Sequence, residues 1–389
     1  MTHYSTQAIH SGPGPDPQSG ALLTPIHQST TYLQDGIGRD RGYTYTRTGN
    51  PTVAALEQRL GILEGVELPA IAFATGMAAT TTLFLALLKA GDRIVVSDVV
   101  YGGTVRVLQQ VFDSFQVEAE FVDTSDLEAL RIALQKPARL LFLETPANPT
   151  LKLTDIEAAC KLAQAAGVQV AVDNTFLTSA LQRPLDLGAD IVVYSTTKYI
   201  EGHNSTVGGA LITADEKLYE RLKFVQGTAG TTQAPWESWL TLRGLKTLPL
   251  RLEKHSSNAL AVAEFLAAQE QVKEVFYPFL PSFSQYELAQ KQQSGGGGML
   301  SFELHGGLEA GAEFIQNLKL FALAENLGAV ESLVTHPATM THGSVPVEQR
   351  HAAGISDGLI RLSVGLEAPQ DLIADLDWAL KCVLGGVLS

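Results

Sequence analysis

The middle of the chain alternates short apolar runs with longer helical segments. Four apolar runs each end in a polar residue: 93–98 (RIVVSD), 139–144 (RLLFLE), 168–173 (VQVAVD) and 190–195 (DIVVYS). Strands buried on both faces have such continuous apolar runs, and strands that alternate with helices form parallel βαβ units. Residues 61–250 therefore predict a large, mostly parallel sheet covered by helices.

Helical segments lie between these runs. Residues 76–91 (GMAATTTLFLALLKAG) predict an apolar helix that Gly91 stops. Residues 154–167 open with Thr154 and Glu157 in the spacing of a capping box, which predicts the start of a second helix. The order of strands and helices predicts an α/β fold.

The two ends of the chain differ from this middle part. Residues 251–269 predict a long helix, and the strand-like segments 299–305 and 358–367 follow it. The first 60 residues are polar and irregular, with scattered glycine and proline. We therefore predict an N-terminal arm (1–60), a large ligand-binding domain (61–250) and a smaller C-terminal α/β domain (251–389).

Composition and charge narrow the class of protein. Hydrophobic residues make up 45% and charged residues 17% of the 389 residues, as in a packed globular protein. The net charge of −14 has no basic clusters, which argues against nucleic acid or an anionic membrane as partner. Neither a signal peptide nor an apolar run of about 18 residues is evident, so we expect a soluble cytoplasmic protein.

Cysteine and histidine give no metal signal. Cys160 and Cys382 stand far apart, and Cys160 lies on an apolar helical face, which favours an inert core thiol. His336 and His342 have no carboxylate or third histidine at ligand spacing. We therefore predict no metal site.

Two polar residues follow neighbouring predicted strands. Asp173 ends one strand and Lys198 follows the next, 25 residues later (198 − 173). One βαβ step would bring both to the edge of the sheet where ligands bind. A turn-capping carboxylate and a solvated lysine are the simpler interpretations. A lysine held among hydroxyls and apolar walls, however, becomes a neutral nucleophile.

A second group of residues suits a phosphate. Gly76 and Met77 open the predicted helix 76–91, where free amides and the positive helix end attract anions. Ser195 and Thr197 add hydroxyls just before Lys198. There is neither a GxGxxG after a strand nor a Gly-Lys pair, so dinucleotide and P-loop sites lose support.

Tyr101 follows the strand 93–98 and would lay its ring over a flat ligand, although packing at a turn is the simpler role. A phosphate site, a strand-end acid and a lysine together describe a pocket for pyridoxal 5′-phosphate. The acid at Asp173 would keep the pyridine nitrogen protonated, so that the ring accepts electrons.

Ordered motifs along nearly the whole chain resemble the Cys/Met-metabolism family of pyridoxal-phosphate enzymes, which includes the cystathionine γ-synthases and γ-lyases. The resemblance rests on YTYTRTGNPT (43–52), ATGMAA (74–79), VYGGT (100–104), ETPANPT (144–150), AVDNTF (171–176), YSTTKYIEGH (194–203), LRGLKTL (242–248), ESLVTHPATMTH (331–342) and RLSVGLE (361–367).

The resemblance implies how the cofactor is held, on a fold of the aspartate-aminotransferase type (fold type I). Lys198 would bind the cofactor aldehyde covalently, and Asp173 would pair with the pyridine nitrogen. Tyr101 would stack on the ring and serve as an acid–base partner. The phosphate would be held by the backbone of Gly76 and Met77 and by the hydroxyls of Ser195 and Thr197.

Other residues would contact the neighbouring subunit or the substrate. Tyr45 and Arg47 match a pair that reaches the phosphate from a second subunit, which implies an obligate dimer, usually doubled to a tetramer. Arg361 would grip the substrate α-carboxylate in a bidentate fork. Asn148 and Ser332 would help in that contact, and Glu331 is a further predicted substrate-binding residue.

The resemblance implies γ-elimination or γ-replacement in trans-sulfuration, on O-acylhomoserine plus cysteine or on cystathionine. Glu331 favours γ chemistry over that of a cystathionine β-lyase, and Gly103 stands where methionine γ-lyases carry a cysteine. Thr44 replaces an acid suited to the distal ammonium of cystathionine, which keeps an O-acylhomoserine sulfhydrylase as an alternative. A cystathionine β-lyase is the other alternative. Asn204 and Ser205 also depart from the family's usual Gly-His-Ser-Asp pattern.

A nicotinamide dehydrogenase and a non-catalytic binding protein are two alternatives to this class of enzyme. A nicotinamide dehydrogenase lacks its glycine fingerprint in this chain. A non-catalytic binding protein on the same fold would not need Lys198, Asp173 and Arg361 together. We therefore expect an enzyme.

Overall fold

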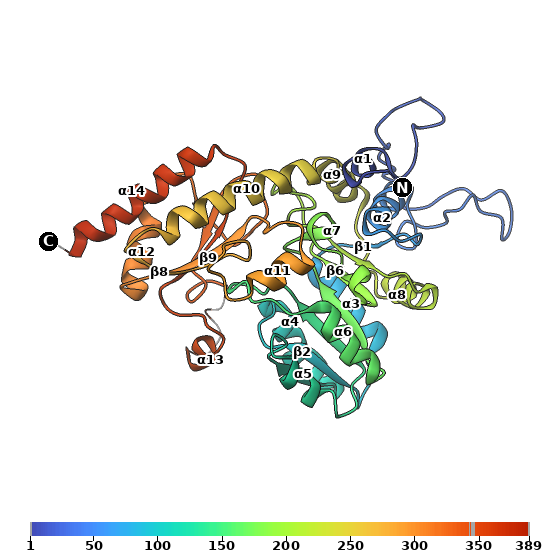
Figure 1. The fold of residues 1–389 in the computed structure, drawn as a ribbon. Helices are drawn as coiled ribbons and strands as arrows, with labels where there is room; N and C mark the ends of the chain where they lie inside the picture. Colours follow the sequence, from blue (N-terminus) through green and yellow to red (C-terminus); the bar gives the residue numbers. More distant parts are fainter. Residues whose placement is uncertain (1, 342, 344–346, 388–389) are drawn as a thin grey trace.

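The computed structural model describes residues 2–341, 343 and 347–387, and a seven-stranded sheet forms its larger part (Figure 1). Its strands run in the order β1-β7-β6-β5-β4-β2-β3. All neighbours are parallel except β7, which is antiparallel to β1 and β6. The strands are β1 (Ile71–Phe73), β2 (Arg93–Ser97), β3 (Glu118–Val122), β4 (Leu140–Glu144), β5 (Gln169–Asp173), β6 (Ile191–Tyr194) and β7 (Gly209–Ile212).

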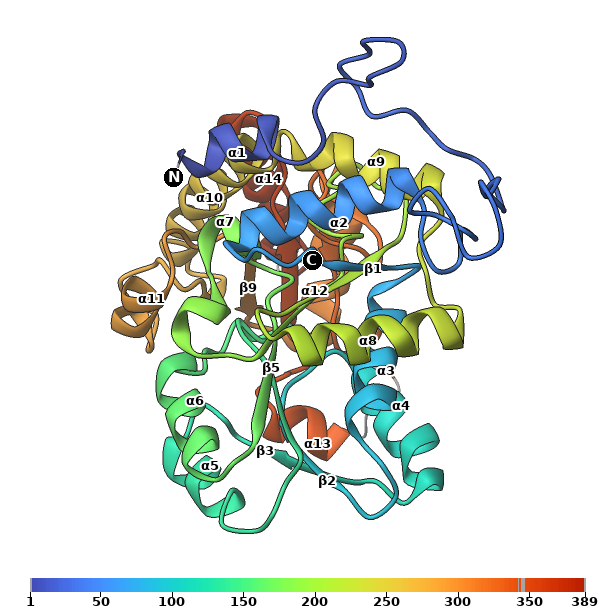
Figure 2. The same ribbon diagram turned by 90° about the vertical axis from the view of Figure 1, so that its right-hand side faces the viewer.

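Helices cover both faces of this sheet, because successive apolar residues of the central strands point to opposite sides. Val95 and Leu141 pack with the α5–α6 side, whereas Ile94 and Phe142 pack with the α3 side. Figure 2 shows α5 and α6 on one side of the sheet and α3 and α4 on the other. The helices of this part are α2 (Pro51–Glu64), α3 (Gly76–Leu87), α4 (Gly102–Val107), α5 (Leu127–Ala133), α6 (Ile156–Ala165), α7 (Thr178–Leu181), α8 (Glu216–Ala229) and α9 (Pro235–Leu245), with short turns at Leu108–Phe112, Asp113–Phe115 and Pro184–Leu187.

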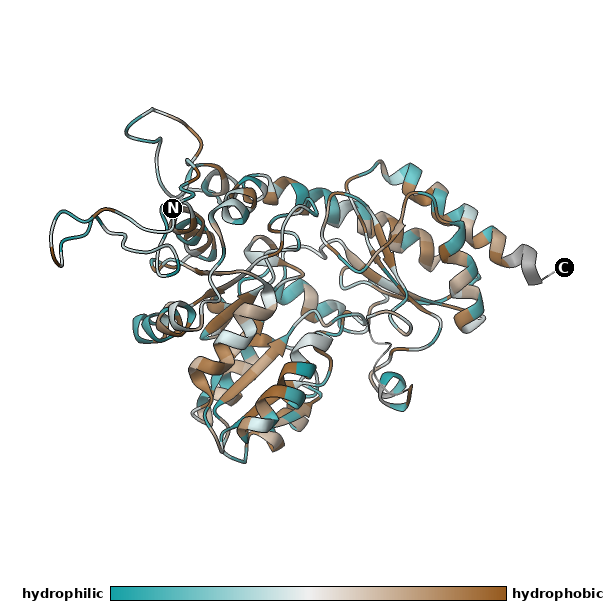
Figure 3. Ribbon diagram, turned by 180° about the vertical axis from the view of Figure 1, so that it is seen from behind, coloured by the Kyte–Doolittle hydropathy of each residue, from teal (hydrophilic) through white to brown (hydrophobic). Residues whose placement is uncertain are grey.

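The C-terminal part is a second α/β unit around a five-stranded sheet. Its strand order is β10-β11-β12-β9-β8, antiparallel except for the β10–β11 pair. The strands are β8 (Val272–Phe276), β9 (Met299–Leu304), β10 (Ala322–Leu323), β11 (Leu333–Thr335) and β12 (Leu359–Ser363). The helices are α10 (Leu248–Ala267), α11 (Tyr286–Gln292), α12 (Gly307–Asn317), α13 (Val347–Ala352) and α14 (Pro369–Val387). Figure 3 shows the strands of both sheets as mainly hydrophobic, while the helices carry both kinds of residue.

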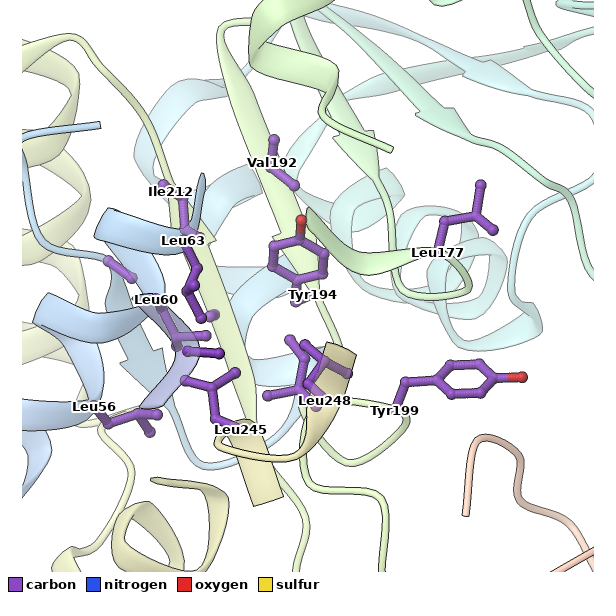
Figure 4. Close-up of a cluster of buried hydrophobic side chains, with 14 of the residues drawn as sticks. Leu56, Leu60, Leu63, Leu177, Val192, Tyr194, Tyr199, Ile212, Leu245 and Leu248 are labelled. Atoms are coloured by element: carbon purple, nitrogen blue, oxygen red, sulfur yellow. The ribbon is translucent and has the colours of Figure 1, made fainter. Parts of the chain in front are cut away.

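A buried cluster anchors the chain on both sides of Lys198. Tyr194 ends β6 and Tyr199 follows the lysine, and their exposed fractions are 1% and 0%. Figure 4 shows Tyr194 in a cluster with Leu63 of α2 and Val192 of β6. Burying one such leucine contributes about 1.5–3 kcal/mol. The cluster therefore fixes the turn that carries Lys198.

The N-terminal segment leaves the body of the molecule. After α1 (Tyr4–His10), the chain forms loops that project away from both α/β units before α2 begins (Figures 1 and 2). Leu22, Leu33 and Ile37 on these loops are 86%, 77% and 107% exposed. Such apolar side chains gain burial only against another surface.

The predicted strands and long helices are confirmed within a few residues, but two details of the prediction are wrong. Helix α6 begins after Asp155, whose side chain accepts the Ala158 amide, and the predicted cap Thr154 bonds to Thr124 instead. Helix α3 ends at Leu87, four residues before Gly91. The predicted domain boundaries, after residues 60 and 250, fall inside α2 and α10.

The described residues contain neither a membrane-spanning helix nor a cluster of metal-ligating side chains. No helix within residues 2–341, 343 and 347–387 is long and apolar enough to cross a membrane. The same residues hold no group of three or more His, Cys, Asp or Glu side chains that would hold a metal ion, and His342 lies outside them. The cytoplasmic location stays a prediction.

Arg251 of α10 is expected to stabilise the turn after Lys198. Its buried guanidinium donates to the carbonyls of Tyr199 (2.6 Å), Ile200 (3.2 Å) and Gly244 (2.9 Å). Arg251→Met would leave these acceptors buried without a donor, so the free energy of unfolding should fall by about 2–4 kcal/mol. Denaturant titration measures this change. Lys217→Met, at an exposed position of α8, is the control, and equal stabilities of the two variants would contradict the prediction.

Candidate active site

A cavity of about 280 Å³ opens at the carboxyl ends of β4, β5 and β6 and reaches the C-terminal unit. It brings together most of the residues predicted from the sequence. Those that line it are Gly76, Met77, Tyr101, Asn148, Asp173, Ser195, Thr197, Lys198 and Arg361. Tyr45, Arg47, Glu331 and Ser332 do not line it.

Lys198 lies in the turn that follows β6. Its amide donates to the Ser195 carbonyl at 3.2 Å, and its own carbonyl accepts the Gly202 amide at 2.8 Å. From the C-terminal unit, Gly328 packs against the same turn with φ +78°. A Cβ at Gly328 would stand 2.7 Å from the Tyr199 amide nitrogen, so only glycine allows this approach.

The Lys198 amine is buried beside a second cation. Burial, followed by the positive charge of Arg361, lowers the pKa of Lys198 to about 8. The Nζ atom donates to Oδ1 of Asn326 at 2.5 Å. A large fraction of this amine is therefore neutral near pH 8, as a nucleophile or general base requires.

Two carboxyl groups lie side by side at the end of the sheet. Asp173 and Glu144 are paired across β5 and β4, and both line the cavity. Burial raises the pKa of Asp173, and burial together with the charge of Asp173 raises the pKa of Glu144. Glu144 accepts the Tyr101 amide at 2.7 Å, and Asp173 accepts the Thr175 amide at 3.0 Å. A cationic ligand nitrogen facing Asp173 would keep that carboxylate charged.

The first turn of α3 forms a close cradle with the turn before Lys198. A Cβ at Gly76 would lie 2.8 Å from the Ser195 Cβ and 3.0 Å from its Oγ. The amides of Gly76 and Met77 belong to the first helical turn, which has no intrahelical partners for them. Thr197 lines the same cavity. These groups suit a phosphate.

Arg361 of β12 has capacity for a further ligand. Its exposed fraction is 3%, Nη1 donates to Asn148 Oδ1 at 2.8 Å, and Nη2 donates to the Asn326 carbonyl at 3.2 Å. Nε has no hydrogen-bond partner among the described residues. Since a buried guanidinium without a carboxylate is costly, the arrangement suits a carboxylate-bearing ligand.

Tyr101 stands at the start of α4, and its side chain is 46% exposed. Its ring packs against Gly103, where a Cβ would lie 2.5 Å from the Tyr101 Cε1 and 2.8 Å from the Met77 Sδ. A side chain at position 103 would therefore displace the ring from its present place.

Four predicted residues lie outside the cavity. Tyr45 and Arg47 are on the N-terminal segment, where Arg47 Nη1 donates to the Gly227 carbonyl and its guanidinium lies 5.7 Å from the Tyr45 ring centroid. The Ser332 hydroxyl donates to Glu367 at 2.8 Å. Glu331 accepts a hydrogen bond from Asn204 at 3.1 Å. The substrate contacts of Ser332 and Glu331 stay predictions.

Sequence reasoning missed several residues of the cavity, among them Glu144, Thr175 and Asn326. Glu144 ends its strand as Asp173 does, so the sequence carried a signal for it. Thr175 accepts the Ser195 amide at 2.9 Å and ties the ends of β5 and β6 together. Asn326 comes from a short polar segment of the C-terminal unit, and nothing in the sequence pattern indicated its contact with Lys198.

The fold and the cavity define a class of protein. A partly neutral lysine, a strand-end carboxyl, an anion cradle at a helix start and a buried arginine surround one space. This donor set fits a flat aldehyde cofactor that carries a phosphate, together with an amino-acid carboxylate. The class is that of pyridoxal-phosphate-dependent enzymes of fold type I.

Comparison with known proteins gives the family. Residues 5–381 match the family model described as Cys/Met metabolism PLP-dependent enzyme, so the chain belongs to this family. It is 48% identical to cystathionine γ-lyase of Bos taurus over 97% of this chain and 94% of that protein. It is also 48% identical to cystathionine γ-synthase of Mycobacterium bovis over 97% and 96% of the two chains.

A solved structure agrees with this family. Cystathionine γ-synthase of Xanthomonas oryzae pv. oryzae, in complex with aminoacrylate and cysteine, superposes with a TM-score of 0.97 at 42% identity, over 99% of each chain. The expected fold type is therefore confirmed, as is pyridoxal phosphate as the family's cofactor. The roles of individual residues stay predictions.

The Lys198 pKa predicts how cofactor attachment depends on pH. Only the neutral amine attacks an aldehyde, so the rate of covalent attachment to cofactor-free protein should rise through about pH 8 and level off above it. Borohydride trapping at timed intervals measures this rate. A midpoint near the ordinary lysine value of 10.5 would contradict the burial effect.

Proposed function

We propose that the protein catalyses γ-replacement or γ-elimination in trans-sulfuration, as an enzyme of the cystathionine γ-synthase or γ-lyase type. One observation carries the proposal. Lys198, whose pKa is lowered, and Arg361, whose Nε has no hydrogen-bond partner in the part of the chain that the structure describes, line one cavity. The chain is also equally identical to a γ-lyase and a γ-synthase.

Substrate binding would be the work of Arg361. Its guanidinium would hold the α-carboxylate of an amino acid, with Asn148 fixing the plane of the guanidinium through Nη1. The ion pair would form in a buried place, where it fixes orientation strongly. The substrate Cα would thereby be held within reach of the Lys198 amine.

Proton transfer would be the work of Lys198 and Tyr101. When bound, pyridoxal phosphate supplies an aromatic ring that takes up the electrons left behind by a departing Cα proton. Lys198, released from its covalent link, would remove the Cα proton with its neutral amine. Tyr101, as the acid–base partner beside the cavity, would then accept a Cβ proton, and the γ-substituent would leave with its bonding electrons. Asp173 would hold a proton at the pyridine nitrogen.

The second reactant decides between replacement and elimination. Addition of a thiol such as cysteine would complete a replacement, whereas water would complete an elimination that yields a 2-oxo acid and ammonia. Close packing of Gly103 against Tyr101 and Met77 speaks against a methionine γ-lyase, which would carry a side chain there. Thr44, in place of an acid, favours an O-acylhomoserine sulfhydrylase as the second candidate.

A homodimer would complete the site. Tyr45 and Arg47 lie outside the cavity of their own chain, on a segment where Leu22, Leu33 and Ile37 are exposed. We propose that they reach the phosphate end of a partner's cavity and that two such dimers form a tetramer. The substrate would be a small amino acid, and we propose that the protein is located in the cytoplasm.

Lys198→Ala tests the proposed chemistry. The purified wild-type protein should be yellow, and borohydride should bleach it and fix the cofactor to a peptide that contains Lys198. The variant should bind the cofactor without a covalent link and lose at least about 10³-fold in kcat, because it lacks both the nucleophile and the base. Turnover should be compared on O-succinylhomoserine, O-acetylhomoserine and cystathionine, each with and without cysteine. Turnover near the wild-type rate in Lys198→Ala would contradict the proposal.

Mixing two inactive variants tests the shared site. Arg47→Ala and Lys198→Ala should each be nearly inactive alone, but subunit exchange between them should restore about a quarter of wild-type activity. Random pairing gives half mixed dimers, each with one intact site of two. Two copies of the same variant, treated identically, are the control. The absence of any recovery after proven subunit exchange would assign Arg47 to its own chain.

A further inference from the structure

A line of hydrogen bonds leads from the Lys198 amine to the outside of the cavity. Lys198 Nζ donates to Asn326 Oδ1 at 2.5 Å, Asn326 Nδ2 donates to Asn204 Oδ1 at 2.6 Å, and Asn204 Nδ2 donates to Glu331 Oε2 at 3.1 Å. The two asparagines come from different α/β units. Neither Asn204 nor Glu331 lines the cavity.

The carboxylate at the outer end sets the direction of every bond. An ionised carboxylate only accepts hydrogen bonds, so Glu331 requires the Nδ2 of Asn204. The carbonyl oxygen of Asn204 then faces inward and requires the Nδ2 of Asn326. The remaining oxygen of Asn326 must face Lys198. An amide by itself has two orientations, and the fixed acceptor at Glu331 selects one.

The loop around Asn204 is held from both sides. Asn204 has a φ of +54°, a left-handed conformation that asparagine tolerates better than most residues. Glu201, 2% exposed, accepts the amides of His203 (3.0 Å) and Ser205 (3.2 Å) and the Ser205 hydroxyl (2.5 Å). Asn204 therefore lies between two residues that Glu201 anchors, which places its side chain beside Asn326.

We propose that Glu331 and Asn204 are positioning residues, which orient the Asn326 amide so that its oxygen holds the Lys198 amine when it is not bound to the cofactor. The proposal rests on the role of Lys198 proposed above. An oxygen at this place accepts from the neutral amine and also stabilises the ammonium. Burial and Arg361 act against the ammonium. The oriented oxygen would offset part of that effect, because a hydrogen bond to the charged form favours that form.

The proposal gives Glu331 an indirect role in place of a direct substrate contact. It also connects two departures from the family pattern with the chemistry, because Asn204 and Ser205 are the residues that differ there. Ser205 keeps the loop in place through Glu201, and Asn204 transmits the orientation.

Replacing the acceptor Glu331 by a donor tests the direction of the hydrogen bonds. In Glu331→Lys the ammonium only donates, so Asn204 should turn, Asn326 should turn with it, and Lys198 should face a donor. We expect kcat to fall about tenfold, the effect of one lost hydrogen bond, with KM nearly unchanged. The pH midpoint of cofactor attachment to cofactor-free full-length protein should fall below about 8. Glu331→Gln presents either a donor or an acceptor and should lose only about twofold.

A second substitution should restore the direction. When Asn204→Asp is combined with Glu331→Lys, the carboxylate at position 204 accepts from the new ammonium and from the Asn326 amide, so the Asn326 oxygen should again face Lys198. Activity and the pH midpoint should return to within about twofold of wild type. Glu253→Lys, at an exposed position of α10, is the control for charge reversal and should leave kcat unchanged. Loss in Glu331→Lys without rescue, or equal loss in Glu331→Gln, would overturn the relay.

Activity at high salt distinguishes an effect of amide orientation from a long-range effect of the charge at position 331. At about 1 M salt the screening length is about 3 Å, so a field from the exposed position 331 should vanish while an orientation effect should remain. Recovery of Glu331→Lys in salt would overturn the proposal. If the wild-type protein holds no covalent cofactor at Lys198, the proposed function is contradicted. If the wild-type protein binds the cofactor covalently but Glu331→Lys has the wild-type kcat and pH midpoint, only the relay is contradicted.

Discussion

The structure depends on holding a lysine amine in a buried place beside another cation. Lys198 and Arg361 share one cavity, and burial with mutual repulsion lowers the pKa of the lysine to about 8. The same burial raises the pKa of the carboxyl groups at the ends of β4 and β5. One cavity thus favours a neutral amine and leaves a carboxyl that needs a cationic partner. Tyr194 and Tyr199 are both buried and anchor the chain on either side of the lysine.

Neither α/β unit contains this site alone. The large sheet contributes Lys198, Asp173 and the cradle at Gly76, while the C-terminal unit contributes Arg361 and Asn326. The two units meet through direct contacts, such as the Arg361–Asn148 hydrogen bond and the approach of Gly328 to the Tyr199 amide. In the proposed function, a substrate carboxylate held by Arg361 of one unit would be presented to the Lys198 amine of the other, so a small shift between the units would alter reactivity.

The chain is equally similar to a γ-lyase and a γ-synthase, and the proposed chemistry accounts for this. Carboxylate binding and proton removal are common to both reactions, so the residues that perform them do not discriminate between the two. Discrimination depends on what is added at the γ-carbon. Thr44 on the N-terminal segment and the Asn204–Glu331 pair are features of this chain that the common machinery does not explain.

The sequence by itself determined the central strands, the three helices α3, α6 and α10, and the residues that follow strands, because apolar periodicity and strand-end polarity are local properties. Asp173, Lys198 and Gly76 were identified for this reason. Glu144 also ends an apolar strand, but it was not predicted as a site residue. Only the tertiary structure decided the contacts of Asn326, which has no local pattern, and the place of Glu331 outside the cavity. It also showed that Asp155, and not Thr154, caps α6, because the buried Thr154 hydroxyl bonds to Thr124. Contacts between distant segments depend on packing, which no local pattern specifies.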